Sequence, residues 1–208
     1  MSLADDLAAV VAEARACTRC AAELPLGPRP VLRVAPTARL LISSQAPSTR
    51  VHATETPFND ASGDRLRSWL GLSAEEFYDA SRIAILPVGL CYPGRLANGG
   101  DAPPRPGCAA LWHPRLLPLM PELRLTLLVG GYAQVYALGP GRMTDRVQDY
   151  AAFLPRYFPL PHPSWRTTGW ERRNPWFGAK VLPALRHLVR ESLGASGFSL
   201  PAARSRRR

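Results

Sequence analysis

A histidine between two prolines is the first feature of this sequence that could do chemistry. His162 follows Pro161 and precedes Pro163 and Ser164, directly after the apolar stretch "YFPL". Each proline fixes its own φ and restricts the residue before it, so this loop loses little conformational entropy when it binds a ligand. A lone loop histidine is more often a structural or surface group than a functional one, so His162 needs support from other residues.

A second candidate loop, "SSQAPS" at residues 43–48, follows the apolar run "ARLLI". That run reads as a buried strand that opens into a loop. In open parallel sheets ligands bind in the crevice outside the carboxyl ends of the strands. Both this loop and the His162 loop follow predicted strands, so we expect them to face one crevice.

The four cysteines are the next candidates for chemistry. Cys17 and Cys20 form a CxxC pair, while Cys91 and Cys108 stand on either side of a Gly- and Pro-rich stretch. Four thiolates can hold either a zinc ion or a cubane 4Fe-4S cluster, and the sequence does not separate the two. A third possibility is that Cys91 and Cys108 are ordinary buried apolar residues.

The charge of the chain makes a polyanion a plausible partner. The formal net charge is +10, and nearly all of the basic residues are arginines, with Lys180 the single lysine. Nucleic acid is the first candidate, although the excess of arginine also suits a solvated surface. The basic end, residues 196–208, follows a Gly- and Ser-rich stretch and is predicted to be a disordered tail that adds phosphate contacts.

The elements that must position these residues alternate between strand and helix. We predict helices over 3–17, 62–72 with Ser62 as N-cap, 73–80, within 108–120, over 132–139 and 144–154, and from about Asn174, with strands near 38–45, 82–90, 123–131 and 157–164. This order predicts one α/β domain over residues 1–195, built as a three-layer α/β/α sandwich on a mainly parallel sheet of about four strands.

The expected compartment is the cytoplasm. No apolar run approaches the roughly 20 residues that a membrane-spanning helix needs. Asp5 and Asp6 occupy the start of the chain, where a signal peptide would carry positive charge. Thiols are kept reduced in the cytoplasm, which argues against two disulfides. We also expect the protein to be a monomer.

Several of these stretches together resemble the uracil-DNA glycosylase superfamily. "QAPS" after the first core strand and "HPS" after the last are similar to the two signature motifs of that superfamily, in the same order. The segment "PFNDASGDRLRSWLG" resembles the part that carries the base-stacking phenylalanine and the helix after it. The cysteine pattern resembles that of the iron-sulfur members, which include families four and five.

This resemblance implies a DNA-repair enzyme that hydrolyses the N-glycosidic bond of uracil, or of a related deaminated base, flipped out of DNA. His162 would be the catalytic donor near uracil O2, and Gln45 stands where many relatives have the acidic residue that orients water. The implied substrate-binding residues are Ala46, Phe58, Ser164 and Arg166. Because an amide is no general base, His52 and Asp60 are secondary candidates.

The resemblance also implies a cofactor. The four cysteines Cys17, Cys20, Cys91 and Cys108 would hold a 4Fe-4S cluster, with zinc the less favoured occupant. The cluster would tie the end of the first helix to a long loop. A single lysine, placed on the predicted last helix, argues against a Schiff-base lyase step, so the glycosylase would be monofunctional.

The sequence also departs from the family pattern. Ser44 and Ser48 replace glycines of the first motif, and a serine would be strained there if the backbone needs a positive φ. The stretch "ILPVGLC" lacks the Asn with which the iron-sulfur relatives read uracil, and Trp165 and Thr167 change the second motif. Two alternatives therefore stay open: a uracil- or abasic-DNA-binding protein with little turnover, or a metal-stapled nucleic-acid-binding module.

Overall fold

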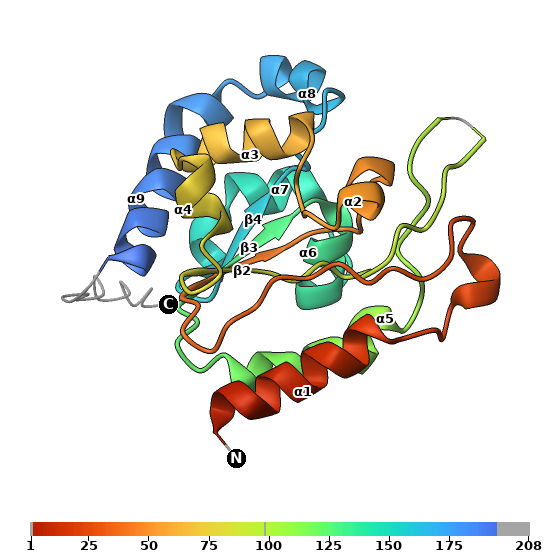
Figure 1. The fold of residues 1–208 in the computed structure, drawn as a ribbon. Helices are drawn as coiled ribbons and strands as arrows, with labels where there is room; N and C mark the ends of the chain where they lie inside the picture. The colour runs from red at the N-terminus through yellow and green to blue at the C-terminus, as the bar shows by residue number, and fades with distance from the viewer. Residues whose placement is uncertain (1, 98, 195–208) are drawn as a thin grey trace.

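A four-stranded parallel sheet forms the centre of the molecule in the computed structural model, which describes residues 2–97 and 99–194 (Figure 1). The strand order is β2-β1-β3-β4. The strands are β1 Leu40–Ser43, β2 Ile83–Ile85, β3 Leu125–Val129 and β4 Tyr157–Leu160. The predicted parallel sheet of four strands is confirmed, although each strand is shorter than the apolar run that predicted it.

The register of the strands brings the ends of the predicted loops to one edge. Ser43 of β1 pairs with Leu128 of β3, and Val129 pairs with Leu160 of β4. Strand β2 lies on one side of β1, while β3 and β4 lie on the other side. The order in which the chain adds strands to the sheet therefore switches sides at β1. A switch of this kind opens a crevice at the carboxyl edge, where the loops after β1, β2 and β4 begin.

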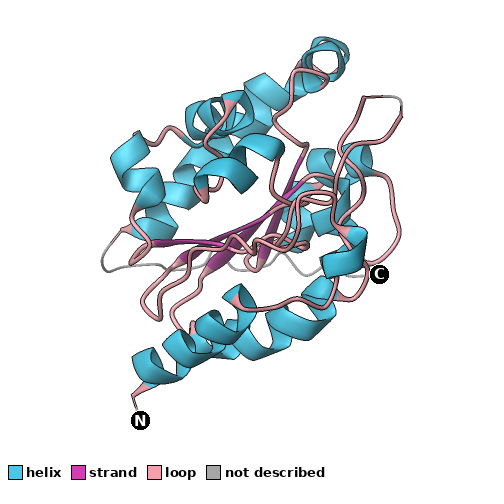
Figure 2. Ribbon diagram, turned by 45° about the vertical axis from the view of Figure 1, so that its right-hand side comes forward, coloured by secondary structure: helices cyan, strands magenta, loops and turns pink. Residues whose placement is uncertain are grey.

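Helices cover both faces of the sheet and produce the predicted three layers (Figure 2). One face carries Ile42, Leu127 and Phe158 and packs against four helices. These helices are α3 Ala61–Leu70, α4 Ala74–Tyr78, α7 Met143–Gln148 and α9 Leu182–Leu193. Alternate residues of a strand point to opposite faces, so the neighbours of these residues face the second layer.

The second face packs against α1 Leu3–Arg15, α5 Cys108–Leu116 and α6 Gly131–Leu138. Leu41 and Ala84 meet α1 and α5, which lie side by side below the sheet in Figure 1. Ser2 and Asp5 form a capping box that starts α1, as the acidic first turn suggested. Gly139 ends α6, as predicted. Short 3-10 turns span Ala21–Glu23, Leu117–Leu119 and Tyr150–Phe153.

Two predicted boundaries were wrong. The N-cap of α3 is Asp60 and not Ser62, because the Asp60 carboxylate accepts the backbone N–H of Gly63. The last helix does not start near Asn174: a π-helical turn, Phe177–Val181, comes first, and Pro183 then occupies the first turn of α9. Proline suits that position because the first helical N–H groups have no partner within the helix.

Two short helices next to the crevice were not predicted. They are α2 Thr49–Thr54 and α8 Thr167–Arg173, which follow the two motif loops. Neither has an apolar stripe of its own, so hydrophobic periodicity gave no signal for them. The predicted basic tail, residues 196–208, lies outside the described residues. No helix in the described part of the chain is long and apolar enough to cross a membrane.

Candidate active site

A pocket lies at the carboxyl edge of the sheet, where the loops after β1, β2 and β4 meet. The side chains that line it and could act on a ligand are Ser44, Ala46, Phe58, Asp60, Asp101 and His162. Two of the four predicted substrate-binding residues, Ala46 and Phe58, are among them. The structure therefore brings the two motif loops to one pocket.

Ser48 fits the first motif loop without backbone strain. Its φ is −79°, and it is the N-cap of α2, where its hydroxyl accepts the N–H of Val51 at 3.3 Å. The same hydroxyl donates to Asp60 at 2.9 Å. Neither Ser44 nor Ser48 is among the described non-glycine residues with a positive φ. Ser48 suits its position because it caps α2, and neither serine needs a left-handed backbone.

Phe58 does adopt a left-handed backbone, with φ of 55°. Its ring lines the pocket and also packs edge-to-face on Phe77, with ring centroids 6.0 Å apart. Its carbonyl oxygen accepts a bond from Tyr78 at 3.2 Å, and Gly63 lies so close to that oxygen that a Cβ would be only 1.7 Å from it. A strained aromatic residue fixed on several sides is typical of a binding site.

His162 enters the pocket from the loop after β4. Burial is the main cause that lowers its pKa, while the negative charges of Asp60 and Asp101 oppose that shift. The imidazole is therefore neutral at pH 7, with one ring N–H available to a ligand. Gly130 allows the loop to pass closely, since a Cβ there would lie 3.3 Å from Cβ of His162.

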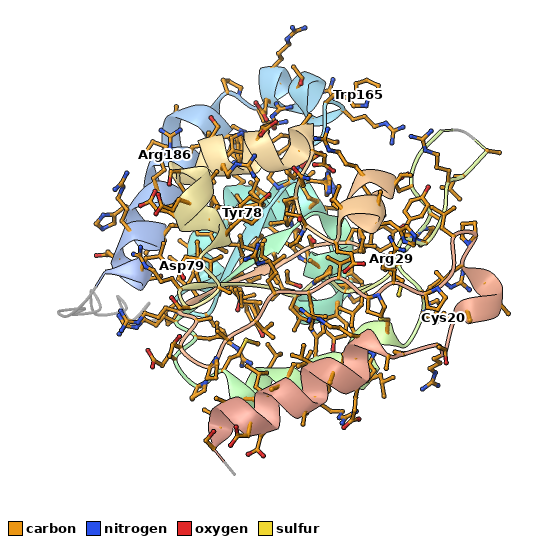
Figure 3. All side chains as sticks on the ribbon, in the orientation of Figure 1. Cys20, Arg29, Tyr78, Asp79, Trp165 and Arg186 are labelled. Atoms are coloured by element: carbon orange, nitrogen blue, oxygen red, sulfur yellow. The ribbon has the colours of Figure 1, made fainter. Side chains whose placement is uncertain are left out.

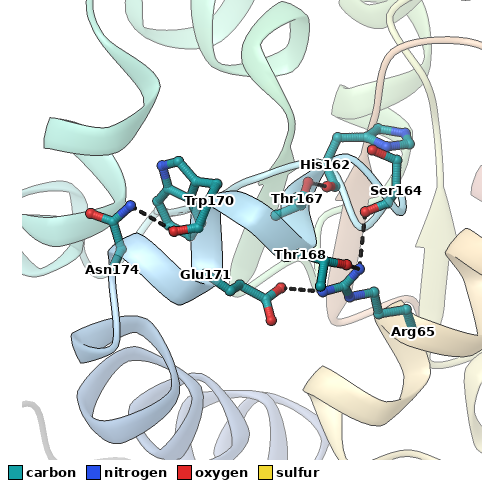
Figure 4. Close-up of polar contacts among 8 residues, drawn as sticks. All are labelled: Arg65, His162, Ser164, Thr167, Thr168, Trp170, Glu171 and Asn174. Carbon is teal, nitrogen blue, oxygen red and sulfur yellow. Dashed lines mark hydrogen bonds and ion pairs between the residues drawn. The ribbon is translucent and has the colours of Figure 1, made fainter.

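Arg65 of α3 holds the His162 loop in place (Figure 4). Its guanidinium donates to the carbonyl of Ser164 at 3.0 Å and to the hydroxyl of Thr168 at 3.1 Å. It also makes an ion pair with Glu171 at 2.7 Å, and the Thr167 hydroxyl donates to the His162 carbonyl. This set of contacts fixes the loop that follows His162 against the helix that follows Phe58.

Ser164 and Arg166 lie outside the pocket lining. Ser164 contributes its backbone carbonyl to the Arg65 contact. The guanidinium of Arg166 donates to the carbonyl of Gly99 at 3.3 Å and lies 5.4 Å from the ring centre of Trp165. Trp165 is 78% exposed at the top of the molecule (Figure 3), which makes it the most exposed large apolar side chain described.

The structure places Gln45 and His52 away from the pocket wall. The side-chain amide of Gln45 donates to the carbonyl of Ala102 at 3.1 Å and so contacts the loop between Cys91 and Cys108. His52 is buried beside Tyr92, with ring centroids 6.2 Å apart, and burial lowers its pKa. Neither residue lines the pocket among the described residues.

Two carboxylates, in contrast, reach the pocket. From the sequence, Asp60 is a secondary candidate and Asp101 belongs to no motif. Asp101 lies on a Gly- and Pro-rich loop with no periodic pattern, so its residue type gave no signal. The position of that loop after a predicted parallel strand was a signal, because every such loop starts at the carboxyl edge.

The four cysteines come together where α1 ends and the loop after β2 begins, the side on which Figure 3 labels Cys20. All four are free and partly buried. Burial is the first cause that raises the pKa of Cys91 to about 11, and the other three cysteines add to the rise. Backbone N–H groups of Arg29 and Leu90 already bond the sulfurs of Cys91 and Cys108.

These thiols fit a sulfur-ligated centre in their chemistry. Thiolates this close repel one another, so a bound cation would stabilise them, and N–H bonds to sulfur are usual around iron-sulfur clusters. Within the described residues no group of three or more His, Cys, Asp or Glu side chains has the spacing to hold a metal ion. The four thiols therefore lie near one another without forming a metal site in the described geometry.

The fold and the pocket define a class of α/β proteins that bind ligands at the carboxyl edge of a parallel sheet. The chain matches the family described as the Uracil DNA glycosylase superfamily over residues 33–186, well over half of its length. The protein therefore belongs to the uracil DNA glycosylase superfamily. It is also similar to the solution NMR structure of a Methanosarcina acetivorans protein provisionally named a uracil DNA glycosylase. The two share 18% identity, with 76% of this chain and 94% of that chain covered and a TM-score of 0.40.

Proposed function

We propose that the protein is a monofunctional DNA glycosylase that removes uracil, or a related deaminated base, from DNA. The observation that carries this proposal is the presence of Phe58, Asp60 and His162 in one pocket. An aromatic ring, a carboxylate and a hydrogen-bond donor are what hydrolysis of an N-glycosidic bond needs from a protein.

The residues divide the reaction between them. As the bond from C1′ to the base nitrogen breaks, its electron pair leaves with the base and positive charge builds on the sugar. The Phe58 ring stacks on the flipped base, and the ring N–H of His162 stabilises the negative charge on the base oxygen. Asp60 contributes a carboxylate to the same pocket, and its two oxygens accept hydrogen bonds from the Ser48 hydroxyl and the Gly63 N–H.

Trp165 and Arg166 suit contacts with DNA beside the pocket. An exposed tryptophan can enter the gap that a flipped nucleotide leaves, and an arginine next to it can bind a phosphate. The net charge of +10 supports binding to the phosphate backbone. In this proposal the protein acts on DNA at the edge of the sheet where the two motif loops end.

We further propose that Cys17, Cys20, Cys91 and Cys108 hold a 4Fe-4S cluster. The support is the convergence of four free thiols and the backbone N–H bonds to two of the sulfurs. The cluster would supply structure, because it would join the end of α1 to the loop that carries Asp101. Iron-sulfur absorbance near 400 nm would distinguish it from zinc, which has none.

The test of the proposed function uses labelled DNA strands that contain one uracil, both single-stranded and in a duplex. After incubation with excess protein, alkali should cleave the strand at the uracil, since an abasic site is alkali-labile. Without alkali the strand should stay intact, because the enzyme has no lyase step. His162→Ala should lower the rate about 100- to 1000-fold. Excision that survives unchanged in this variant would contradict the role of His162.

A second function, uracil or abasic-site binding with little turnover, is favoured by one observation. No asparagine or glutamine side chain lines the pocket among the described residues, so no amide is placed there to read the base edge. The same experiment separates the two functions. A strand that stays intact after alkali, although the protein binds uracil-containing DNA more tightly than a matched strand, would favour the binding protein.

A further inference from the structure

Asp101 reaches the pocket from the loop between Cys91 and Cys108, which is here called the cysteine loop (residues 92–107). The residue lines the pocket together with His162, and its charge acts on that imidazole. Its backbone forms a bridge with Arg95, so the two sides of the loop run antiparallel at this point. Asp101 is thus placed by backbone pairing and not by its position in a helix or strand.

One contact holds the cysteine loop directly to the first motif loop, and a second reaches that loop through Gly89. The amide of Gln45 donates to the carbonyl of Ala102, the residue after Asp101, at 3.1 Å. Two residues further on, Pro104 packs on Gly89 so closely that a Cβ at Gly89 would lie 2.8 Å from Cβ of Pro104. The N–H of Gly89 in turn donates to the carbonyl of Gln45 at 2.8 Å.

A third contact holds the loop on the other side of Asp101. The guanidinium of Arg166 donates to the carbonyl of Gly99 at 3.3 Å. Asp101 therefore lies between two anchored residues: Gly99, which is bonded to Arg166 after the second motif loop, and Ala102, which is bonded to Gln45 of the first motif loop. A carboxylate held at both sides in this way keeps its place at the pocket without a hydrogen bond of its own.

Asp60 and Asp101 differ in whether their carboxylate oxygens already accept hydrogen bonds within the protein. Asp60 accepts bonds from the Ser48 hydroxyl at 2.9 Å and the Gly63 N–H at 3.1 Å, which fix it as the cap of α3. No hydrogen bond or ion pair from a described residue engages the Asp101 carboxylate, and the residue is exposed at the pocket. Asp101 thus has the uncommitted oxygens that a water molecule needs.

We propose that Asp101 is a catalytic residue, the carboxylate that orients and deprotonates the attacking water, and that Gln45 is the positioning residue that holds it. This inference rests on the proposed glycosylase function. The water oxygen bonds to C1′ as the bond to the base nitrogen breaks. The electron pair of that bond leaves with the base, and the proton of the water passes to Asp101. The negative charge of Asp101 also stabilises the cationic sugar of the transition state.

The first measurement is the single-turnover rate of uracil excision by Asp101→Asn. The rate should fall about 100-fold, as loss of a general base usually does. Glu75→Gln is the matched control, because it removes one charge from the exposed start of α4, at the opposite edge of the sheet. The control should keep the rate of the unmodified protein. An unchanged rate in Asp101→Asn would overturn the role in activating water.

A second measurement needs no turnover. DNA that carries a cationic pyrrolidine in place of the sugar is compared with DNA that carries the neutral tetrahydrofuran analogue. The unmodified protein should prefer the cation, and Asp101→Asn should reduce that preference about 10-fold, since one charge pair is lost. An equal preference in both proteins would overturn the placement of Asp101 at the sugar. Failure of the unmodified protein to excise any base would overturn the proposed function and leave this binding test standing.

The role of Gln45 is tested by a double-mutant cycle. Gln45→Ala should lower the excision rate about 10-fold in the unmodified protein and have almost no effect when Asp101 is already asparagine. Residues that act through one another show this non-additivity, while independent residues add. Equal effects of Gln45→Ala in both backgrounds would mean that Gln45 does not act through Asp101.

Discussion

The loop after β4 and the cysteine loop each bring a side chain to the same pocket, but different interactions hold them. The His162 loop has two prolines beside its histidine, and Arg65 joins it to α3 through three polar contacts. The cysteine loop contacts its neighbours through the backbone carbonyls of Gly99 and Ala102 and through an ion pair of Arg105 with Glu23, and it has a free cysteine at each end.

This difference teaches how a loop without a core can still be placed. A chain of this length has many conformations to lose, and a few hydrogen bonds of about 1 kcal/mol each do not offset that entropy. In the short His162 loop, the two prolines restrict the backbone and Arg65 bonds the loop to α3, so contacts within the protein are enough to fix it. The longer cysteine loop needs fixed ends, which four ligated thiolates would supply.

The largest effect is expected when the ends of the cysteine loop are released. In Cys91→Ser/Cys108→Ser we expect the absorbance near 400 nm of the proposed 4Fe-4S cluster to disappear and the midpoint of thermal unfolding to fall by about 10 °C or more, because that cluster would stabilise the fold. Limited proteolysis should then cut within residues 92–107 while the His162 loop stays protected.

The control for this experiment is a substitution in the same loop that leaves all four cysteines in place. Leu96→Ala removes an exposed apolar side chain from the same loop and should leave absorbance and protection unchanged. Equal protection of both loops in the cysteine variant would mean that the two loops do not differ in how they are held.

A smaller effect is expected from Arg65→Met, which releases the other loop. The excision rate should fall about 10- to 100-fold, because a shift of about 1 Å in a catalytic group can have that effect. Binding of tetrahydrofuran-containing DNA should change less than the rate. Single-turnover kinetics and a binding titration of the same variant measure the two quantities.

Arg186→Met is the matched control for Arg65. Arg186 donates to the carbonyls of Ser68 and Trp69 at the far end of α3, so its loss removes the same charge and similar contacts away from the pocket. Arg65→Lys keeps the charge but not the forked geometry, and should recover only part of the rate. A full recovery would show that charge alone matters at this position.

The smallest expected effect concerns the pH dependence of stability, and it compares a histidine of the loop after β4 with one that follows the cysteine loop. Burial lowers the pKa of His162, and it also lowers that of His113, which lies on the helix after the cysteine loop and bonds the carbonyl of Pro87 at 3.0 Å. Below pH 6.5 these two histidines take up protons in the unfolded chain, whereas in the folded protein their imidazoles stay neutral to a lower pH. The free energy of unfolding should therefore decrease as the pH is lowered, by less than about 1.4 kcal/mol per pH unit for each histidine.

Urea unfolding at pH 7.5 and pH 5.5 checks this sign. Both His162→Gln and His113→Gln should show a smaller loss of stability between the two pH values than the unmodified protein. A variant whose stability rises as the pH falls would contradict the assignment.

The layers of the fold could be predicted because burial leaves a pattern in the sequence. Runs such as "LLIS" and "LTLLV" are buried on both faces of a parallel sheet and therefore read as continuous apolar stretches. The boundaries were less accessible, since Asp60 and Ser62 are both good N-caps and only the bond to Gly63 separates them.

The candidate site was only partly visible in the sequence. The prolines beside His162 indicated function through residue type, and Phe58 was indicated by the family resemblance; His162 and Phe58 both line the pocket. Gln45 gave the same kind of signal, yet its amide bonds Ala102 and not the pocket. The residue type of Asp101 gave no signal, because its place at the pocket depends on loop contacts between segments far apart in the chain.

The sequence by itself determined the alternation of strands and helices, the family and the two motif loops, because these depend on local residue types and their spacing. Only the tertiary structure decided which carboxylates reach His162 and which arginine holds its loop. Arg65 and Ser164 are 99 positions apart, and Gln45 and Ala102 are 57 apart. Contacts at such separations form when packing of the sheet and its helices brings loop ends together, and no local pattern records them.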